Sequence, residues 1–132
     1  MGSKSRTKGK VGEREVLNLL GDRLGQRFAR NLQQSDQGGC DCMELDGIAL
    51  EVKRAAKPAL NNWWSQAEEQ AIALGRTPVL AYRLDRQQWQ FVIRLHDLVA
   101  EVPINDERAT LSLEGFCQWY EAMQGFIVEA AA

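Results

Sequence analysis

The sequence predicts an α/β fold: a central mixed β-sheet of about five strands flanked by helices. Segments whose apolar residues recur every three or four positions alternate with short apolar runs, patterns typical of helices and strands respectively. Glycines, prolines and one Asp-Gly pair separate these segments. The chain has 132 residues, 45% of them hydrophobic and 26% charged, which suits one globular core. We therefore expect a single domain over residues 1–132, with residues 1–8 as a flexible basic arm.

Local signals set the boundaries of the expected elements. Gly25 and Gly75 each follow a helical pattern and are expected to end it as C-caps. The pair Asp46-Gly47 separates two apolar runs and predicts a β-hairpin. The expected order is helix Gly12–Leu24, strand Gln26–Leu32, strand Cys40–Leu45, strand Ile48–Arg54, helix Trp63–Leu74 opened by Asn61 or Asn62, strand Pro78–Leu84, strand Trp89–Leu95, a connection over 99–110 and helix Ser112–Met123.

Composition excludes several classes of protein. No apolar run approaches the roughly 18–20 residues of a membrane span, and no apolar stretch follows the basic N-terminus, so we expect neither a membrane partner nor a signal peptide. Cys40, Cys42 and Cys117 are an odd number and are expected to be reduced thiols in a cytoplasmic protein, or in the host cytoplasm if the source is viral. A structural zinc site is not expected, because His96 is the only histidine and no paired ligand knuckle is present.

Charge is distributed unevenly along the chain. The net charge is -2, yet eight of the sixteen basic residues fall within the first 30 positions: Lys4, Arg6, Lys8, Lys10, Arg14, Arg23, Arg27 and Arg30. Residues 101–132 carry six acids and one basic residue. Such asymmetry can make one face positive and able to bind nucleic acid. The alternative is a solvated basic terminus without a binding role.

Four polar residues interrupt otherwise apolar patterns. Glu13 lies on the apolar stripe of the first helix, where a charge is costly unless it is paired or binds a metal; a capping role in the first turn is the alternative. Glu51 and Lys53 alternate with apolar neighbours and share one face of a strand; a surface ion pair is the alternative. Asp41 lies one strand away. Three such acids would be hard oxygen ligands suited to Mg²⁺, with Mn²⁺ as a substitute.

The hairpin register decides whether these acids meet. A regular two-residue turn at Asp46-Gly47 pairs Asp41 with Val52, which places Asp41 and Glu51 on opposite faces of the sheet. One extra residue in the turn pairs Asp41 with Glu51 instead. We therefore predict a bulged three-residue turn, or a bulge nearer Asp41.

Several segments together resemble a known family. KGKVGEREVLNLL, GGCD, ALEVK and PVLAYR followed by WQFV are similar to the archaeal-type Holliday junction resolvases, nucleases of the PD-(D/E)XK superfamily, over about residues 8–95. The resemblance implies a restriction-endonuclease-like fold and Mg²⁺-dependent hydrolysis of DNA. It also implies a homodimer that cuts four-way junctions. The alternatives are a nuclease of this superfamily that acts on flaps or duplex DNA, and a DNA-binding protein that does not cleave.

The resemblance also assigns roles to residues of this chain. It implies Glu13, Asp41, Glu51 and the carbonyl of Val52 as metal ligands, and Lys53 as the lysine that acts with Glu13, Asp41 and Glu51 in catalysis. Arg14 and Arg30 match positions that contact phosphates, and Lys8, Lys10 and Arg54 complete the expected DNA-binding set. Asp46 is rejected as the motif acid because it falls in the turn itself. Ser35, Gln66, Gln70, Trp63 and Trp64 are candidates without an assigned role, although one tryptophan is expected to pack on the sheet.

Overall fold

A computed structural model describes residues 2–31 and 40–131. Its sheet has four strands in the order β1-β2-β3-β4, where β1 and β2 are parallel and the other neighbours are antiparallel. The strands are β1 (Ile48–Ala55), β2 (Thr77–Leu84), β3 (Gln90–Arg94) and β4 (Arg108–Ser112). The α/β class and the mixed sheet are confirmed, with four strands in place of the expected five.

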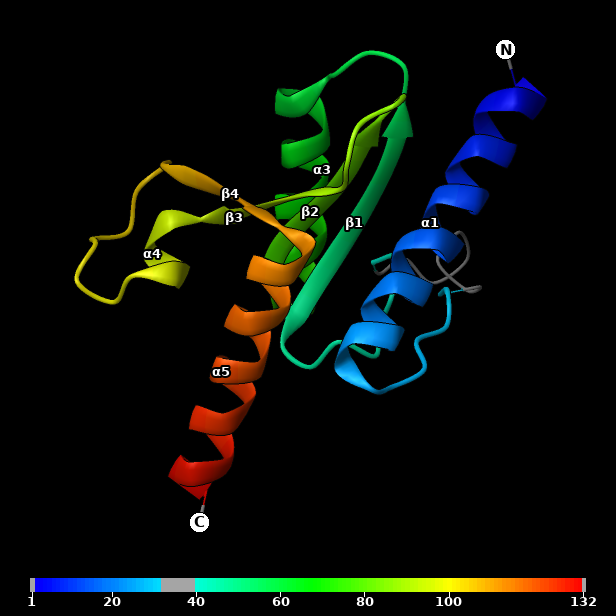
Figure 1. The fold of residues 1–132 in the computed structure, drawn as a ribbon. Helices are drawn as coiled ribbons and strands as arrows, with labels where there is room; N and C mark the ends of the chain where they lie inside the picture. The colour runs from blue at the N-terminus through cyan, green and yellow to red at the C-terminus, as the bar shows by residue number, and fades with distance from the viewer. Residues whose placement is uncertain (1, 32–39, 132) are drawn as a thin grey trace.

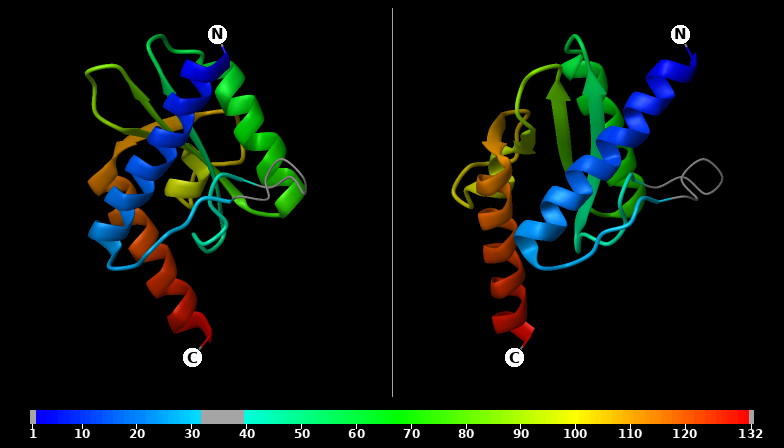
Figure 2. Two further views of the ribbon diagram at one scale, coloured as in Figure 1. Left: turned by 90° about the vertical axis from the view of Figure 1, so that its right-hand side faces the viewer. Right: turned by 45° about the vertical axis from the view of Figure 1, so that its right-hand side comes forward.

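Helices cover both faces of this sheet (Figures 1 and 2). They are α1 (Gly2–Leu24), α3 (Leu60–Leu74), the short α4 (Leu95–Leu98) and α5 (Leu113–Ala131). α1 and α5 pack on one face, and α3 covers the other. Within the described parts of the chain, none of these helices is both long and apolar enough to cross a membrane.

The alternation of side chains along β1 feeds both cores. Leu50 and Val52 belong to the larger core, together with Val16 and Leu20 of α1. Ala49 packs on the other face against Ala71 of α3. Because strand side chains alternate, Glu51 and Lys53 fall on the α3 face, next to the free edge of β1.

α1 begins at Gly2, ten residues before the expected start at Gly12. No proline interrupts residues 2–12, and a helix that is already nucleated extends at little cost. The segment expected to be an arm over residues 1–8 therefore continues the helix from residue 2 onward. Gly12 is needed for packing, since a Cβ at this position would lie 2.9 Å from Cβ of Arg54.

Two expected strands are absent from the sheet. Residues 26–31 run beside 40–44 without a ladder, because Ala29 N–H donates to the Glu44 carboxylate at 2.6 Å. Asn31 N–H donates to the Asp41 carbonyl at 2.9 Å. Cys40–Leu45 makes one isolated bridge, from Cys42 to Leu50, in place of a strand. In return, β4 begins within the region expected to be a connection, and α4 lies directly before that region.

The helix caps agree with the sequence at the C-terminal ends. Gly25 and Gly75 have left-handed φ values of 72° and 66° and follow α1 and α3. The start of α3 differs from the expectation, because its N-cap is Ala59 and neither Asn61 nor Asn62. The chain therefore enters α3 without a side-chain hydrogen bond at the cap.

Candidate functional site

The hairpin before β1 contains a bulge. Ile48 N–H donates to the Leu45 carbonyl at 3.1 Å, and Gly47 has a φ of 74°, so the turn itself has two central residues. Cys42 and Leu50 are bridge partners on the two arms of the hairpin. Leu45 is three positions after Cys42 on the first arm, whereas Leu50 is only two positions after Ile48 on the second. The extra residue lies on the arm that carries Asp41, which confirms the predicted bulge nearer Asp41 and excludes the regular hairpin.

Asp41 lies at a kink in the same arm, just before this bulge. Its neighbours Cys40 and Cys42 pack into cores on opposite faces of the sheet, although residues two apart on a regular strand would share a face. The side chain is 4% exposed, and Oδ2 accepts the Val52 N–H at 2.6 Å. A carboxylate thus takes the place of a backbone carbonyl at the free edge of β1, next to Glu51.

Glu51 is the second buried acid. Among the described residues, only Asp41 and Glu51 are charged side chains classed as buried, and Glu51 is 6% exposed. Its Oε1 lies 3.4 Å from Nζ of Lys53, as expected for residues two apart on one strand. Burial raises the pKa of Glu51; Lys53 opposes this rise, and the charge of Glu13 adds to it.

Glu13 approaches this site from α1. Its carboxylate is 18% exposed and accepts a hydrogen bond from Nε of Arg30 at 2.6 Å. The pair fixes the extended segment 26–31 against α1. Arg30 was expected to contact DNA phosphate, and in the free protein it neutralises Glu13.

The acids fit a hard cation only in part. Within residues 2–31 and 40–131, no three acid, cysteine or histidine side chains are grouped closely enough to enclose a metal ion. Mg²⁺, however, is commonly bound through one or two carboxylates plus water and substrate phosphate. Asp41 and Glu51 supply two buried carboxylates of this kind. The carbonyl of Val52 points to the same edge as its N–H, which faces Asp41.

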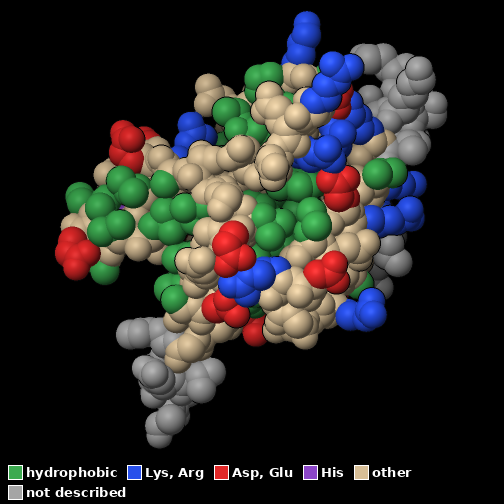
Figure 3. All heavy atoms as spheres, in the orientation of Figure 1, with side chains coloured by type: hydrophobic (Ala, Val, Ile, Leu, Met, Phe, Trp, Pro, Cys, Tyr) green, Lys and Arg blue, Asp and Glu red, His purple; other side chains and the backbone are tan. Residues whose placement is uncertain are grey.

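Basic side chains gather on the adjoining part of α1. We call Lys8, Lys10 and Arg14 the α1 basic cluster. Lys10 and Arg14 are exposed, and Figure 3 shows blue side chains gathered near the upper end of α1 and β1. A hollow of about 340 Å³ beside α1 is lined by Arg14, Leu17, Asn18, Phe28, Ala29 and Arg30. The surface next to the acids is therefore positive, although the whole chain is slightly acidic.

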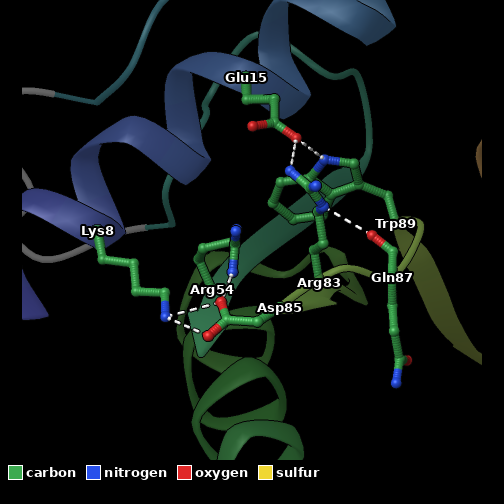
Figure 4. Close-up of polar contacts among 7 residues, drawn as sticks. All are labelled: Lys8, Glu15, Arg54, Arg83, Asp85, Gln87 and Trp89. Carbon is green, nitrogen blue, oxygen red and sulfur yellow. Dashed lines mark hydrogen bonds and ion pairs between the residues drawn. The ribbon is translucent and has the colours of Figure 1, made fainter. Parts of the chain in front are cut away.

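Lys8 and Arg54 lie together and hold the same acid. Both contact Asp85, which follows β2: Lys8 Nζ lies 2.8 Å and Arg54 Nη1 2.5 Å from Oδ1 (Figure 4). No pattern in the sequence pointed to Asp85, because an acid in a hairpin loop is common. Glu15 was also missed: placed outside the apolar stripe, it accepts hydrogen bonds from Arg83 and Trp89 at 2.6 and 2.8 Å.

Most of the other candidates lie on α3. Trp64 is buried against Leu80 and Val92, and Trp63 packs on Tyr82 with ring centroids 5.8 Å apart, so both tryptophans pack on the α3 face. Gln66 is exposed and Gln70 half-buried on α3. His96 is on α4, beside β3 and away from β1. Ser35 lies outside the described residues.

Comparisons with known proteins identify the family of this chain. A family model described as "Phage putative PDDEXK endonuclease" matches residues 4–121. Protein D14 of Escherichia phage T5 is 25% identical over 116 residues, covering 70% of this chain and 72% of that protein. The structure of Hjc, a Holliday junction resolvase of Archaeoglobus fulgidus, matches with 21% identity and a TM-score of 0.48, over 80% of this chain and 84% of that one. Because the family model spans most of the sequence, this chain belongs to the phage PD-(D/E)XK endonuclease family.

Proposed function

We propose that this endonuclease hydrolyses phosphodiester bonds in DNA with Mg²⁺, and that its substrate is the four-way junction. The observation that carries the proposal is the pair of buried carboxylates, Asp41 and Glu51, beside Lys53 at a bulged sheet edge. Two buried acids in a small protein oppose folding unless they are compensated. Such costly pairs of ionisable groups are typical of functional sites.

Each residue of the site has a role that follows from its position. Asp41, Glu51 and the Val52 carbonyl would hold the metal ion, and Mn²⁺ would substitute for Mg²⁺. A bound ion would supply an activated water and would stabilise negative charge on the phosphate. Lys53, partly exposed beside Glu51, is placed to neutralise charge that develops on the phosphate oxygens. Glu13 of α1, the further metal ligand that the resemblance implied, is held by Arg30 in the free protein and would complete the ligand set once Arg30 releases it.

DNA binding would come from the basic surface beside these acids. The α1 basic cluster, Arg30 and Arg54 provide cations for backbone phosphates, and such contacts supply most of the affinity irrespective of sequence. The net charge of -2 does not oppose this role, because many of the positive side chains are gathered near the upper end of α1 and β1.

A junction substrate favours a homodimer. Resolving a four-way junction takes two symmetric cuts, and a two-fold axis relates two sites in the way that these cuts require. The activity would serve DNA recombination and repair. The three cysteines are free thiols, in keeping with the reducing cytoplasm.

The test compares substrates of different shape at equal concentration. A labelled four-way junction, a linear duplex and a flap are incubated with the protein in Mg²⁺, in Mn²⁺ and in EDTA, while light scattering measures the oligomeric state. We expect symmetric cuts in the junction with either metal and none in EDTA. Preferred cutting of flap or duplex would identify a different substrate, and binding without cleavage would identify a DNA-binding protein.

A further inference from the structure

The carboxylate of Asp85 is held by two cations that the proposed function assigns to DNA. Lys8 reaches it from α1, with Nζ 2.8 Å from Oδ1 and 3.1 Å from Oδ2, and Arg54 reaches it from β1. Figure 4 shows both side chains converging on this one group. The two contacts hold the pKa of Asp85 below its ordinary value, so it carries its charge at neutral pH.

We propose that Lys8 and Arg54 form a phosphate site for the DNA backbone, and that Asp85 occupies this site until DNA displaces it. A carboxylate and a phosphodiester each present two oxygens that share one negative charge. Arginine and lysine bind both kinds of group through the same donors. The inference rests on the proposed function in one respect, which is that DNA is the ligand.

The position of the site suits a contact close to the cleaved bond. Arg54 directly follows Lys53 on β1, and the two side chains point to opposite faces of the strand. Asp85 is fixed at the same end of the sheet, because its N–H donates to the Ala55 carbonyl at 3.1 Å. A phosphate bound by Arg54 would therefore lie three positions along β1 from the buried Glu51.

The exposure of Asp85 and Lys8 permits the exchange, although Arg54 is 17% exposed. Asp85 is 44% exposed and Lys8 35%, so a phosphate can reach them without opening the core. Exposed ion pairs stabilise a protein only slightly, and each corresponds to about a 1.4- to 5-fold effect on an equilibrium. The need to displace Asp85 therefore lowers the affinity for DNA by only a small factor.

The turn that carries Asp85 is defined by its backbone. Gln87 N–H donates to the Leu84 carbonyl at 3.1 Å, and Arg86 has a φ of 66°, an uncommon value for a residue other than glycine. A second acid, Glu15, ties the same hairpin to α1 through Arg83. The loop thus retains an anchor when Asp85 releases its cations.

The experiment measures binding without cleavage. Affinity for labelled four-way junction and linear duplex is determined by fluorescence anisotropy in EDTA at several salt concentrations. We expect Asp85→Asn to bind both DNAs about 2- to 20-fold more tightly, as two exposed pairs would allow. Its salt dependence should be steeper, because Asp85 no longer takes up a counterion when DNA binds.

Two controls separate this effect from a general change of charge. Glu101→Gln removes an equal charge from an exposed loop after α4 and should give a smaller gain. Lys8→Gln should weaken binding more in the Asp85→Asn background than in the wild type, because only there is Lys8 fully available to DNA. Melting curves establish that each variant folds, and Asp85→Ser replaces Asp85→Asn if the latter does not.

The outcomes distinguish this inference from the proposed function. Unchanged or weaker binding by folded Asp85→Asn would show that Asp85 only braces the hairpin, and would overturn the inference even if the wild type cleaves DNA. An equal gain in Glu101→Gln, or the absence of DNA binding by any variant, would also overturn it. Tighter binding without cleavage by the wild type would support the phosphate site and refute the nuclease activity alone.

Discussion

The two roles of Asp41 can be separated by replacing it in two ways. Its carboxylate is a proposed metal ligand, and it also accepts the Val52 N–H at 2.6 Å in a site that is 4% exposed. Asp41→Asn keeps an oxygen that can accept this hydrogen bond, whereas Asp41→Ala leaves the buried N–H without this acceptor. Both variants lose the negative charge beside Glu51, so the effect of the charge on stability cancels in the comparison.

The structure sets the size of the expected difference. An unsatisfied buried donor costs about 1–3 kcal/mol, and a neutral hydrogen bond recovers part of this, so Asp41→Asn should be more stable than Asp41→Ala by about 1–2 kcal/mol. The unfolding entropy of a 132-residue chain is about 0.28 kcal/mol per kelvin. The Asn variant should therefore melt about 4–7 °C above the Ala variant in calorimetry with EDTA. Cleavage should fall at least about 100-fold in both, since a lost metal ligand removes several kcal/mol of transition-state stabilisation.

Two results would refute this reasoning. Equal melting temperatures would mean that the Asp41–Val52 hydrogen bond does not support the kink. Junction cleavage at the wild-type rate by Asp41→Asn would remove the carboxylate from the mechanism, whatever the melting temperatures show.

Four further predictions follow from other parts of the structure. Gly12→Val should destabilise the protein by about 1–3 kcal/mol, measured by urea unfolding, because its Cβ would lie 2.9 Å from Arg54 Cβ; Gly9→Ala, which meets nothing within 4 Å, should be neutral or stabilising and is the control. Neutralising the α1 basic cluster should weaken binding to every DNA shape and lower the salt slope by up to about 2.7, at 0.9 per phosphate contact; an unchanged slope would make the cluster a solvated surface. In EDTA, Glu51→Gln should melt above the wild type at neutral pH, because a carboxyl group with a raised pKa in the folded state destabilises the protein once it is ionised. The difference in melting temperature should close as pH falls toward the ordinary pKa of 4.5, and a difference independent of pH would contradict the assignment. All three cysteine thiols are buried and their pKa values are raised by burial, so they should react with a disulfide reagent only after unfolding; rapid labelling of the native protein would contradict this.

The elements predicted correctly from the sequence are those whose local signals agree with their packing. β1 opens with three apolar residues, β2 and β3 each contain a continuous apolar run, and α3 and α5 have apolar residues at helical spacing. Gly25 and Gly75 end their helices because the left-handed conformation they adopt has little cost for glycine. In these segments the backbone and the core favour the same structure, so the sequence alone is sufficient.

The errors fall where contacts from distant segments decide the backbone. β4 has an alternating pattern of exposed and half-buried residues at the sheet edge, and only its pairing with β3 makes it a strand. Residues 26–31 were expected to form a strand, but the Ala29 N–H donates to the Glu44 side chain and is not available for hydrogen bonding to a neighbouring strand. The partners Asp85 and Glu15 were missed for the same reason, since their contacts lie 31 to 77 positions away in sequence.

The bulge before β1 links the largest error in the fold to the best prediction about the site. Cys40–Leu45 was expected to be a strand, but this arm carries an extra residue after Cys42 and a kink at Asp41. A continuous ladder would have satisfied the Val52 N–H with a backbone carbonyl and placed the two acids on opposite faces. With the bulge, the Asp41 side chain satisfies that N–H, and its carboxylate stays at the sheet edge where Glu51 and Lys53 are. The lost strand pairing and the gathered acids are therefore two consequences of the same irregular arm. Restoring the ladder by deleting one residue between Cys42 and Leu45 should stabilise the hairpin and abolish cleavage together.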